Sequence, residues 1–385
     1  MTAAARPTGP DGSACLPAGP EGIAAAAAWL GQGQLVGFPT ETVYGLGADA
    51  ADPVAVARIY AAKGRPSNHP VIVHLPPGGD PLWWAADLPP AAQALIDAFW
   101  PGPLTLILGR AARIPAAVSG GQDSIGLRCP SHPVAQALLE AFSALRGGHG
   151  GVAAPSANRF GKVSPTAARH VRDEFGDAIP VLDGGDSAVG IESTIVDLSR
   201  GFPALLRPGH VTPEQIAAVL GGMPSMPSTF ASQAASAPAT VAMPFARDGH
   251  AGPAPGDRPA PRASGTLRAH YAPATPLALL SAPAIAAILR ARAADVPGMR
   301  YAVVTHSAAG AAALAGAADV EWVQAPANAA GYARVLYGML RALDGAHVVR
   351  ILVEALPDDP AWQAVADRLG RAAAAFLPEA GAAPD

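Results

Sequence analysis

A proline-rich stretch divides this chain and most constrains how it can fold. Residues 221–263 hold eight prolines in 43 positions, with few charges and no periodicity of apolar side chains. Average proline usage is about 5%, and so long a connection is unusual inside one compact domain. We therefore expect a semi-extended linker over residues 221–274, between one folding unit at 21–220 and another at 275–378.

Composition bounds the class of protein. The 385 residues are 50% hydrophobic with a net charge of −4, so each unit can bury a core, and a chain-wide nucleic-acid-binding field is excluded. Residues 1–20 lack the features of a secretion signal and predict a disordered lead. Cys15 and Cys129 are too few for a disulfide framework or a zinc site, which is typical of a reducing cytosol. With no apolar run of about 18 residues, we expect a cytoplasmic protein with no membrane span.

Residues 22–220 alternate short apolar runs with helical ones, which predicts an α/β domain of mixed topology. Runs bounded by Gly, Pro or polar residues predict strands over Gln34–Phe38, Val71–Leu75, Leu104–Leu108, Ile125–Cys129 and Thr194–Leu198. Prolines in first turns predict helices over Asp52–Ala62, Pro90–Phe99, Pro133–Leu145, Pro165–Phe175 and Pro213–Leu220. Asp52, Ser164 and Thr212 are placed to cap three of these helices.

Residues 275–377 show a regular β-α alternation. Strands are expected over Leu277–Leu280, Tyr301–Thr305, Val320–Gln324 and Val349–Glu354, and helices over Ala284–Ala294, Ala308–Leu314, Ala329–Leu343 and Pro360–Phe376. This alternation predicts a parallel, doubly wound sheet.

Polar and cationic side chains gather at the ends of the predicted elements. Thr42 lies in the turn after the strand that ends at Phe38, where α/β sheets bind ligands. Lys63 either complements the end of its helix or, with Arg65, binds phosphate. Arg128 is either a partner in a buried ion pair or a two-pronged clamp for a carboxylate.

Small hydroxyl and amide side chains follow in a second group. Pro155-Ser156-Ala157-Asn158 exposes a hydroxyl and an amide beside small residues that let a ligand approach the backbone. Ser164 stands at a predicted helix start, as a cap, as an anion site or as both. Gly45–Ala50 fits a dinucleotide fingerprint only loosely, and Asn158–Val163 lacks the Ser or Thr of a phosphate-binding loop. His69 and His74 have no third metal ligand nearby.

Seven segments, in this order and spacing, resemble the threonylcarbamoyl-AMP synthase family in its two-domain form. They are Pro39–Gly47, Lys63–Pro66, Trp100–Thr105, Pro155–Asn158, Gly190–Thr194, Arg207–Gly209 and His270–Pro273. The resemblance implies a YrdC-like domain with a mixed, twisted α/β sheet, a long Pro-rich linker that reaches over the active site, and a small Rossmann-like parallel α/β domain. It implies an L-threonylcarbamoyladenylate synthase, a nucleotidyltransferase that joins L-threonine, bicarbonate and ATP and releases pyrophosphate. Mg²⁺ would arrive on the ATP phosphates, with no metal ligand from the protein. Expected partners are the tRNA-modification proteins that consume the product, and tRNA itself.

The same resemblance assigns the site residues. The threonine pocket would be lined by Thr42, His74, Arg128, Ala154 and Ser193. ATP would be held by Lys63, Arg65, His69, Ser124, Ser156, Asn158, Ser164, Arg207, His270 and Tyr271, with Lys63 and Arg65 supplying the catalytic charge. His69 departs from the asparagine of many relatives.

Three alternatives stay open beside this reading. One is an RNA-binding YrdC-like module without synthase activity, although aromatic residues make up only 5% of this acidic chain and readers of single strands cluster aromatic and basic residues. Another is a carbamoyltransferase of hydrogenase maturation, which would need zinc-finger cysteines. The third makes the C-terminal unit a docking domain for modification partners, a role that is compatible with catalysis.

Overall fold

The computed structural model describes residues 6–226, 259–292, 300–312 and 320–377, and the chain splits into two compact units. Unit 1 comprises Met1–Phe160 and Ser164–Thr266, and unit 2 comprises Gly161–Val163 and Leu267–Asp385. Residues 227–258, most of the expected linker, lie outside the described residues. The described residues that follow them, 259–266, belong to unit 1.

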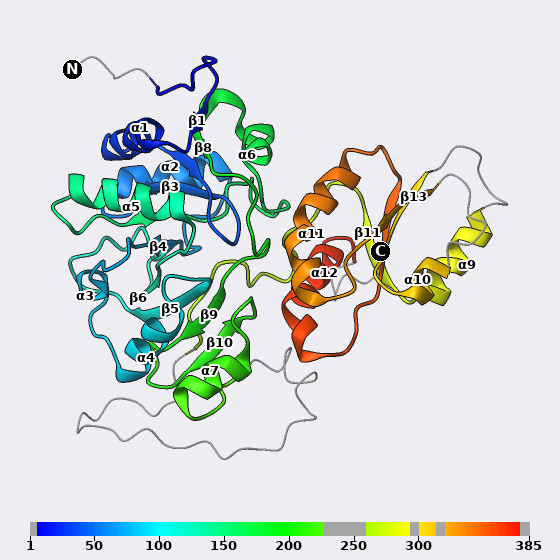
Figure 1. Cartoon of the computed structure of the whole chain (residues 1–385). Coiled ribbons are helices and arrows are strands. Elements are labelled where there is room, and N and C mark those ends of the chain that lie inside the picture. Colours follow the sequence, from blue (N-terminus) through cyan, green and yellow to red (C-terminus); the bar gives the residue numbers. More distant parts are fainter. Residues whose placement is uncertain (1–5, 227–258, 293–299, 313–319, 378–385) are drawn as a thin grey trace, which may run out of the picture. The chain divides into compact units, whose positions relative to one another are not determined.

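Unit 1 is built on a ten-stranded mixed sheet (Figure 1). Its strands are β1 Cys15–Pro17, β2 Val36–Phe38, β3 Gly45–Asp49, β4 Ile72–His74, β5 Leu104–Gly109, β6 Ser124–Arg128, β7 Val152–Ala153, β8 Val181–Asp183, β9 Thr194–Asp197 and β10 Ala204–Arg207. They lie in the order β1-β8-β2-β3-β7-β4-β6-β5-β9-β10. Neighbours β4 and β6 run parallel while β5 and β6 run antiparallel, which confirms the mixed topology expected from the sequence.

The helices of unit 1 other than α6 begin at a proline, in some cases after a capping residue. They are α1 Pro20–Gly31, α2 Pro53–Lys63, α3 Pro81–Trp84, α4 Pro90–Phe99, α5 Pro133–Leu145, α6 Ala168–Phe175 and α7 Pro213–Leu220, with a 3-10 turn at Gly176–Ala178. Asp52 caps α2 by accepting from the N–H of Val54, and Thr212 and Gln215 form a capping box at α7. Both predicted caps are confirmed.

The predicted cap at Ser164 is wrong. Helix α6 begins at Ala168, and its N-cap residue Ala167 makes no side-chain bond. The Ser164 hydroxyl donates instead to Glu192 Oε1 at 2.6 Å, so a partner distant in sequence takes it away from the helix end.

Five short strands of unit 1 were not predicted, namely β1, β3, β7, β8 and β10. The disordered lead predicted through residue 20 is wrong for Cys15–Pro17, because this segment pairs in parallel with β8. The glycine-rich turn after Phe38 continues into β3. A Cβ on Gly47 would lie 3.0 Å from the Phe38 ring and one on Gly45 3.1 Å from it, so these glycines make room for the aromatic side chain.

Hydrophobic clusters cover both faces of the sheet. One joins Phe38 to Leu30 of α1 and Phe142 of α5, and the other joins Leu46 to Ile59 of α2. Successive side chains of a strand point to opposite faces of the sheet. Because both faces are buried, polar groups are expected at the ends of the strands.

Unit 2 is a four-stranded parallel sheet with helices (Figure 1). Its strands are β11 Leu277–Leu280, β12 Tyr301–Thr305, β13 Val320–Gln324 and β14 Arg350–Glu354, in the order β11-β14-β12-β13. Its helices are α9 Ala282–Arg292, α10 Ala308–Ala312, α11 Ala329–Asp344 and α12 Gln363–Ala374, with a 3-10 turn at Pro360–Trp362. All three strand pairings are parallel, as predicted. In the described part of the chain, no helix combines the length and apolar character needed to cross a membrane.

Candidate functional site

Arg128, the last residue of β6, is held by three acceptors. Its Nε donates to the Gly102 carbonyl at 3.2 Å, Nη1 to Thr42 Oγ1 at 3.0 Å and Nη2 to Glu41 Oε1 at 2.6 Å. The side chains of Arg128 and Glu41 are only 4% and 8% exposed. Arg128 is therefore in a buried ion pair, one of the two interpretations left open by the sequence. A guanidinium has five N–H groups, so donors remain for a carboxylate.

The turn between β2 and β3 presents Thr42 to this arginine. Thr40 Oγ1 donates its only proton to the Val43 carbonyl at 2.6 Å. In the 2.8 Å contact between the two threonine hydroxyls, Thr42 must then be the donor. Thr42 Oγ1 is left to accept from Arg128, so the orientation of both side chains is defined.

His74 lies beside Arg128 because β4 and β6 run parallel with these residues in register. Burial, and then the charge of Arg128, lower the pKa of His74 to about 3, so the imidazole is neutral. Its Nδ1 is buried without a hydrogen bond to any described residue. Ala154 follows β7, the other neighbour of β4, and its N–H donates to the Ile72 carbonyl. Three residues predicted to bind threonine, Arg128, His74 and Ala154, therefore lie on or directly after three neighbouring strands.

Ser193 and Arg207 form a second polar group. Arg207 Nε donates to the Ser193 carbonyl at 3.0 Å, and its Nη2 donates to Ser193 Oγ at 3.1 Å. Ser193 Oγ is also 2.8 Å from Thr105 Oγ1 on β5. Ser193, which is predicted to line the threonine pocket, is thus hydrogen-bonded to Arg207, which is predicted to hold ATP.

Lys63 connects the end of α2 to the Pro155–Asn158 segment. Its ammonium donates to the Ser156 carbonyl at 2.6 Å and to the Asn158 carbonyl. Burial and the nearby Arg65 hold the pKa of Lys63 well below its ordinary value. Lys63 is 3% exposed, and its two acceptors in the structure are backbone carbonyls of the Pro155–Asn158 segment.

Arg65 extends from the same helix end, after Gly64 adopts the left-handed conformation that ends the helix. Its Nη2 donates to the Pro70 carbonyl at 2.9 Å, and its guanidinium lies 5.6 Å from the centre of the Phe160 ring. The His69 ring packs edge-on against the same phenyl ring at 5.5 Å. Partial burial, and then Arg65, lower the pKa of His69. Arg65 and His69, both predicted for ATP, are therefore neighbours.

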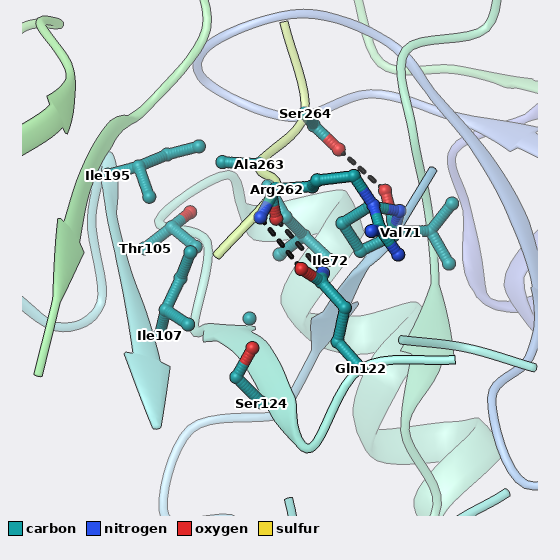
Figure 2. A pocket seen from close by; sticks show the side chains of 12 residues that line it. Val71, Ile72, Thr105, Ile107, Gln122, Ser124, Ile195, Arg262, Ala263 and Ser264 are labelled. Atoms are coloured by element: carbon teal, nitrogen blue, oxygen red, sulfur yellow. Dashed lines mark hydrogen bonds between the residues drawn. The ribbon is translucent and has the colours of Figure 1, made fainter. Parts of the chain in front are cut away.

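A strap of three residues, Arg262 to Ser264, lies across this part of unit 1 and lines a pocket with Ser124 (Figure 2). Arg262 and Gln122 bond reciprocally, through the backbone N–H and carbonyl of Arg262 and the side-chain amide of Gln122. Ser264 accepts from Arg207 through its carbonyl at 2.8 Å and from Arg65 through its hydroxyl at 3.3 Å. The strap therefore touches Arg65 and Arg207, the two arginines predicted to hold ATP.

Sequence reasoning assigned no role to Gln122, Thr105 or Glu41, nor to individual residues of the strap, which lies in the linker expected to reach over the active site. The strap ends a segment without periodicity, so no local pattern marks it. Glu41 was visible in the segment Pro39–Gly47, and its proximity to Arg128 only appears once β2 and β6 are in one sheet.

His270 and Tyr271 belong to unit 2. Tyr271 has a φ of 62°, which is rare for a bulky side chain, and its ring is 5.7 Å from that of Tyr337. The Arg368 guanidinium lies 5.5 Å from the Tyr271 ring, and the His270 N–H donates to the Arg371 carbonyl. Close packing holds this backbone conformation.

Comparison with known proteins identifies the family. Residues 28–209 match a family model described as telomere recombination, and residues 211–374 match the threonylcarbamoyl-AMP synthase C-terminal domain. The threonylcarbamoyl-AMP synthase of Bacillus subtilis is 35% identical over 357 residues, 91% of this chain and 92% of the relative. That of Pyrococcus abyssi is 43% identical over 209 residues, 54% of this chain and 60% of the relative.

A solved structure agrees with these sequence matches. The crystal structure of P. abyssi Sua5 complexed with L-threonine is similar with a TM-score of 0.74 and 32% identity, covering 92% of this chain and 94% of that one. The similarity extends over both units, as does the match to the Bacillus relative. This chain therefore belongs to the threonylcarbamoyl-AMP synthase family.

Proposed function

We propose that this protein forms threonylcarbamoyl-AMP and pyrophosphate from L-threonine, bicarbonate and ATP. Family membership supports this proposal, and one observation carries it to the site: the direct bond between Arg207 and Ser193. The reaction must join a group derived from threonine to the α-phosphorus of ATP. Ser193 is predicted to bind threonine and Arg207 to bind ATP. A hydrogen bond between these two residues would bring the two substrates together, as such a reaction requires.

The chemistry proceeds in two balanced steps. The unprotonated threonine amine attacks the bicarbonate carbon, which gives a carbamate and water. A carbamate oxygen then attacks the α-phosphorus of ATP, and the bond to the β-phosphate oxygen breaks to release pyrophosphate. This places the protein among the nucleotidyltransferases.

No side chain has to form a covalent intermediate, so the protein acts by positioning and by stabilising charge. Arg65 and Arg207 would offset the phosphate charge, while Lys63 would hold the loop at Ser156 and Asn158 beside them. Mg²⁺ would be bound through the ATP phosphates. When bound, it would neutralise part of their charge.

The product suggests the wider setting. An acyl adenylate is an activated donor, so the proposed consumers are proteins that transfer the threonylcarbamoyl group to tRNA in the cytoplasm. The formation of threonylcarbamoyl-AMP itself would require neither these proteins nor tRNA.

Pyrophosphate release from ATP tests the proposal when it is measured with and without threonine and with and without bicarbonate. We expect release only when both are present. ATP turnover that is indifferent to threonine would contradict the proposal and point to another acceptor. No turnover together with tight RNA binding would favour the binding module.

A further inference from the structure

Glu41 has a carboxylate oxygen that the fold does not use. Its Oε1 accepts from Arg128 at 2.6 Å, while Oε2 is buried and has no hydrogen bond to any described residue. The backbone is fixed as well, because the Glu41 carbonyl accepts from the N–H of Val189 at 2.7 Å. A buried acceptor without a partner is unfavourable, so its presence needs a reason.

Arg128 is also incompletely satisfied. Of its five N–H groups, three donate to Gly102, Thr42 and Glu41. Two remain without a hydrogen bond to a described residue. The pair therefore offers an unused acceptor and unused donors next to each other, in a place that is nearly closed to water.

An α-amino acid is complementary to such a pair. Its ammonium and carboxylate groups are attached to the same carbon, so it presents a donor of positive charge and an acceptor of negative charge side by side. A cation alone would be repelled by Arg128, and an anion alone would be repelled by Glu41. Only a ligand with both charges gains from both members of the pair.

We propose that Glu41 is a positioning and specificity residue for threonine, with Oε2 accepting a hydrogen bond from the α-ammonium group. This inference rests on the proposed function, in which Arg128 receives the carboxylate. Glu41 would orient the nitrogen, which bonds to the bicarbonate carbon after the ammonium group has released one proton to solvent. It would also discriminate against carboxylates that have no amine.

The test is calorimetric binding of two ligands to the full chain without ATP. The ligands are threonine and 2,3-dihydroxybutanoate, in which a hydroxyl replaces the amine. Glu41→Gln keeps the size of the side chain and removes its charge. We expect threonine affinity to fall by roughly 30-fold, since one partner of a buried charge contact is lost. The dihydroxy acid should bind equally well or more tightly, because Arg128 is no longer neutralised.

The matched control is Glu140→Gln, which makes the same change at an exposed position of α5. It should alter neither affinity. If Glu41 only holds Arg128 in place, Glu41→Gln will weaken both ligands in parallel, which overturns the proposal. Unchanged threonine binding would overturn it too. Should the variant not fold, the wild-type protein still decides, because equal affinity for the two ligands would exclude recognition of the amine.

Failure of this inference can be told apart from failure of the proposed function. A wild-type protein without threonine-dependent pyrophosphate release loses the proposed function whatever the variants do. If the wild-type protein is active but Glu41→Gln weakens the binding of both ligands equally, only the role proposed for Glu41 is refuted.

Discussion

The Lys63 ammonium lies 2.6 Å from the carbonyl oxygen of Ser156, a residue 93 positions away. The same ammonium bonds to the Asn158 carbonyl. One buried cation therefore fixes the loop whose residues Ser156 and Asn158 are predicted to hold ATP. Lys63 acts on this loop through its backbone, and this defines what its replacement should do.

Lys63→Met should both destabilise unit 1 and weaken ATP use. The carbonyls of Ser156 and Asn158 lose this donor, at a cost of about 1–3 kcal/mol for the buried Asn158 carbonyl and less for the half-buried Ser156 carbonyl. Urea unfolding and the KM for ATP measure the two effects. Lys162→Met is the control, since Lys162 is exposed and should tolerate the change. Lost activity at unchanged stability would instead assign Lys63 to direct phosphate contact.

Arg128→Lys should impair threonine use although the charge is kept. A lysine cannot reproduce the planar arrangement that reaches Gly102, Thr42 and Glu41 at once. We expect the KM for threonine to rise by about 10-fold to 100-fold, with the KM for ATP nearly constant. Arg169→Lys changes a side chain that is 68% exposed and is the control. A threonine KM equal to that of the wild type would contradict the assignment.

Arg262→Ala should release the strap. The side chain donates to the carbonyls of Asn68 and Gly120, each at 3.0 Å, and both donors disappear. Because Ser264 of the strap bonds to Arg65 and Arg207, we expect the KM for ATP to rise about 5-fold or more while the KM for threonine changes less. Arg300→Ala removes only a surface ion pair and serves as the control. Equal effects of the two substitutions would show that the strap has no part in ATP binding.

Glu354 should make the stability of unit 2 depend on pH. Burial raises the pKa of its carboxyl group, but hydrogen bonds from the Ser307 hydroxyl and the N–H groups of His306 and Ser307 outweigh this and leave the pKa below its ordinary value of 4.5. A lowered pKa in the folded state stabilises the protein above the ordinary value, and this contribution is lost as the pH falls through the lowered pKa.

Glu354→Gln should therefore be less stable than the wild type at pH 7, by about 1–3 kcal/mol. The difference should shrink steadily once the pH falls below about 4. Thermal unfolding at several pH values measures it, with Glu321→Gln in the exposed ion pair to Arg300 as the control. A difference that does not vary with pH would show that the charge of Glu354 is not involved.

Local chemistry accounts for what was predictable in the fold. The strands Leu277–Leu280, Tyr301–Thr305 and Val320–Gln324 have the predicted bounds, because they stand in a regular alternation with helices. The caps at Asp52 and Thr212 depend on residues within three positions. The glycine-rich strand β3 was not predicted. Its glycines are needed because the ring of Phe38 on the neighbouring strand β2 packs against them, and this contact is not visible in the local sequence.

The sequence by itself determined the family, the two α/β units and the candidate site residues, because the order of the motifs and the periodicity of apolar residues are properties of the linear sequence. Only the tertiary structure decided which of these residues meet. Glu41 and Arg128 are 87 positions apart, Ser164 and Glu192 are 28 apart, and Arg65 and Ser264 are 199 apart. The physical reason is that buried polar groups must find partners, and the sheet order decides which ones come within reach.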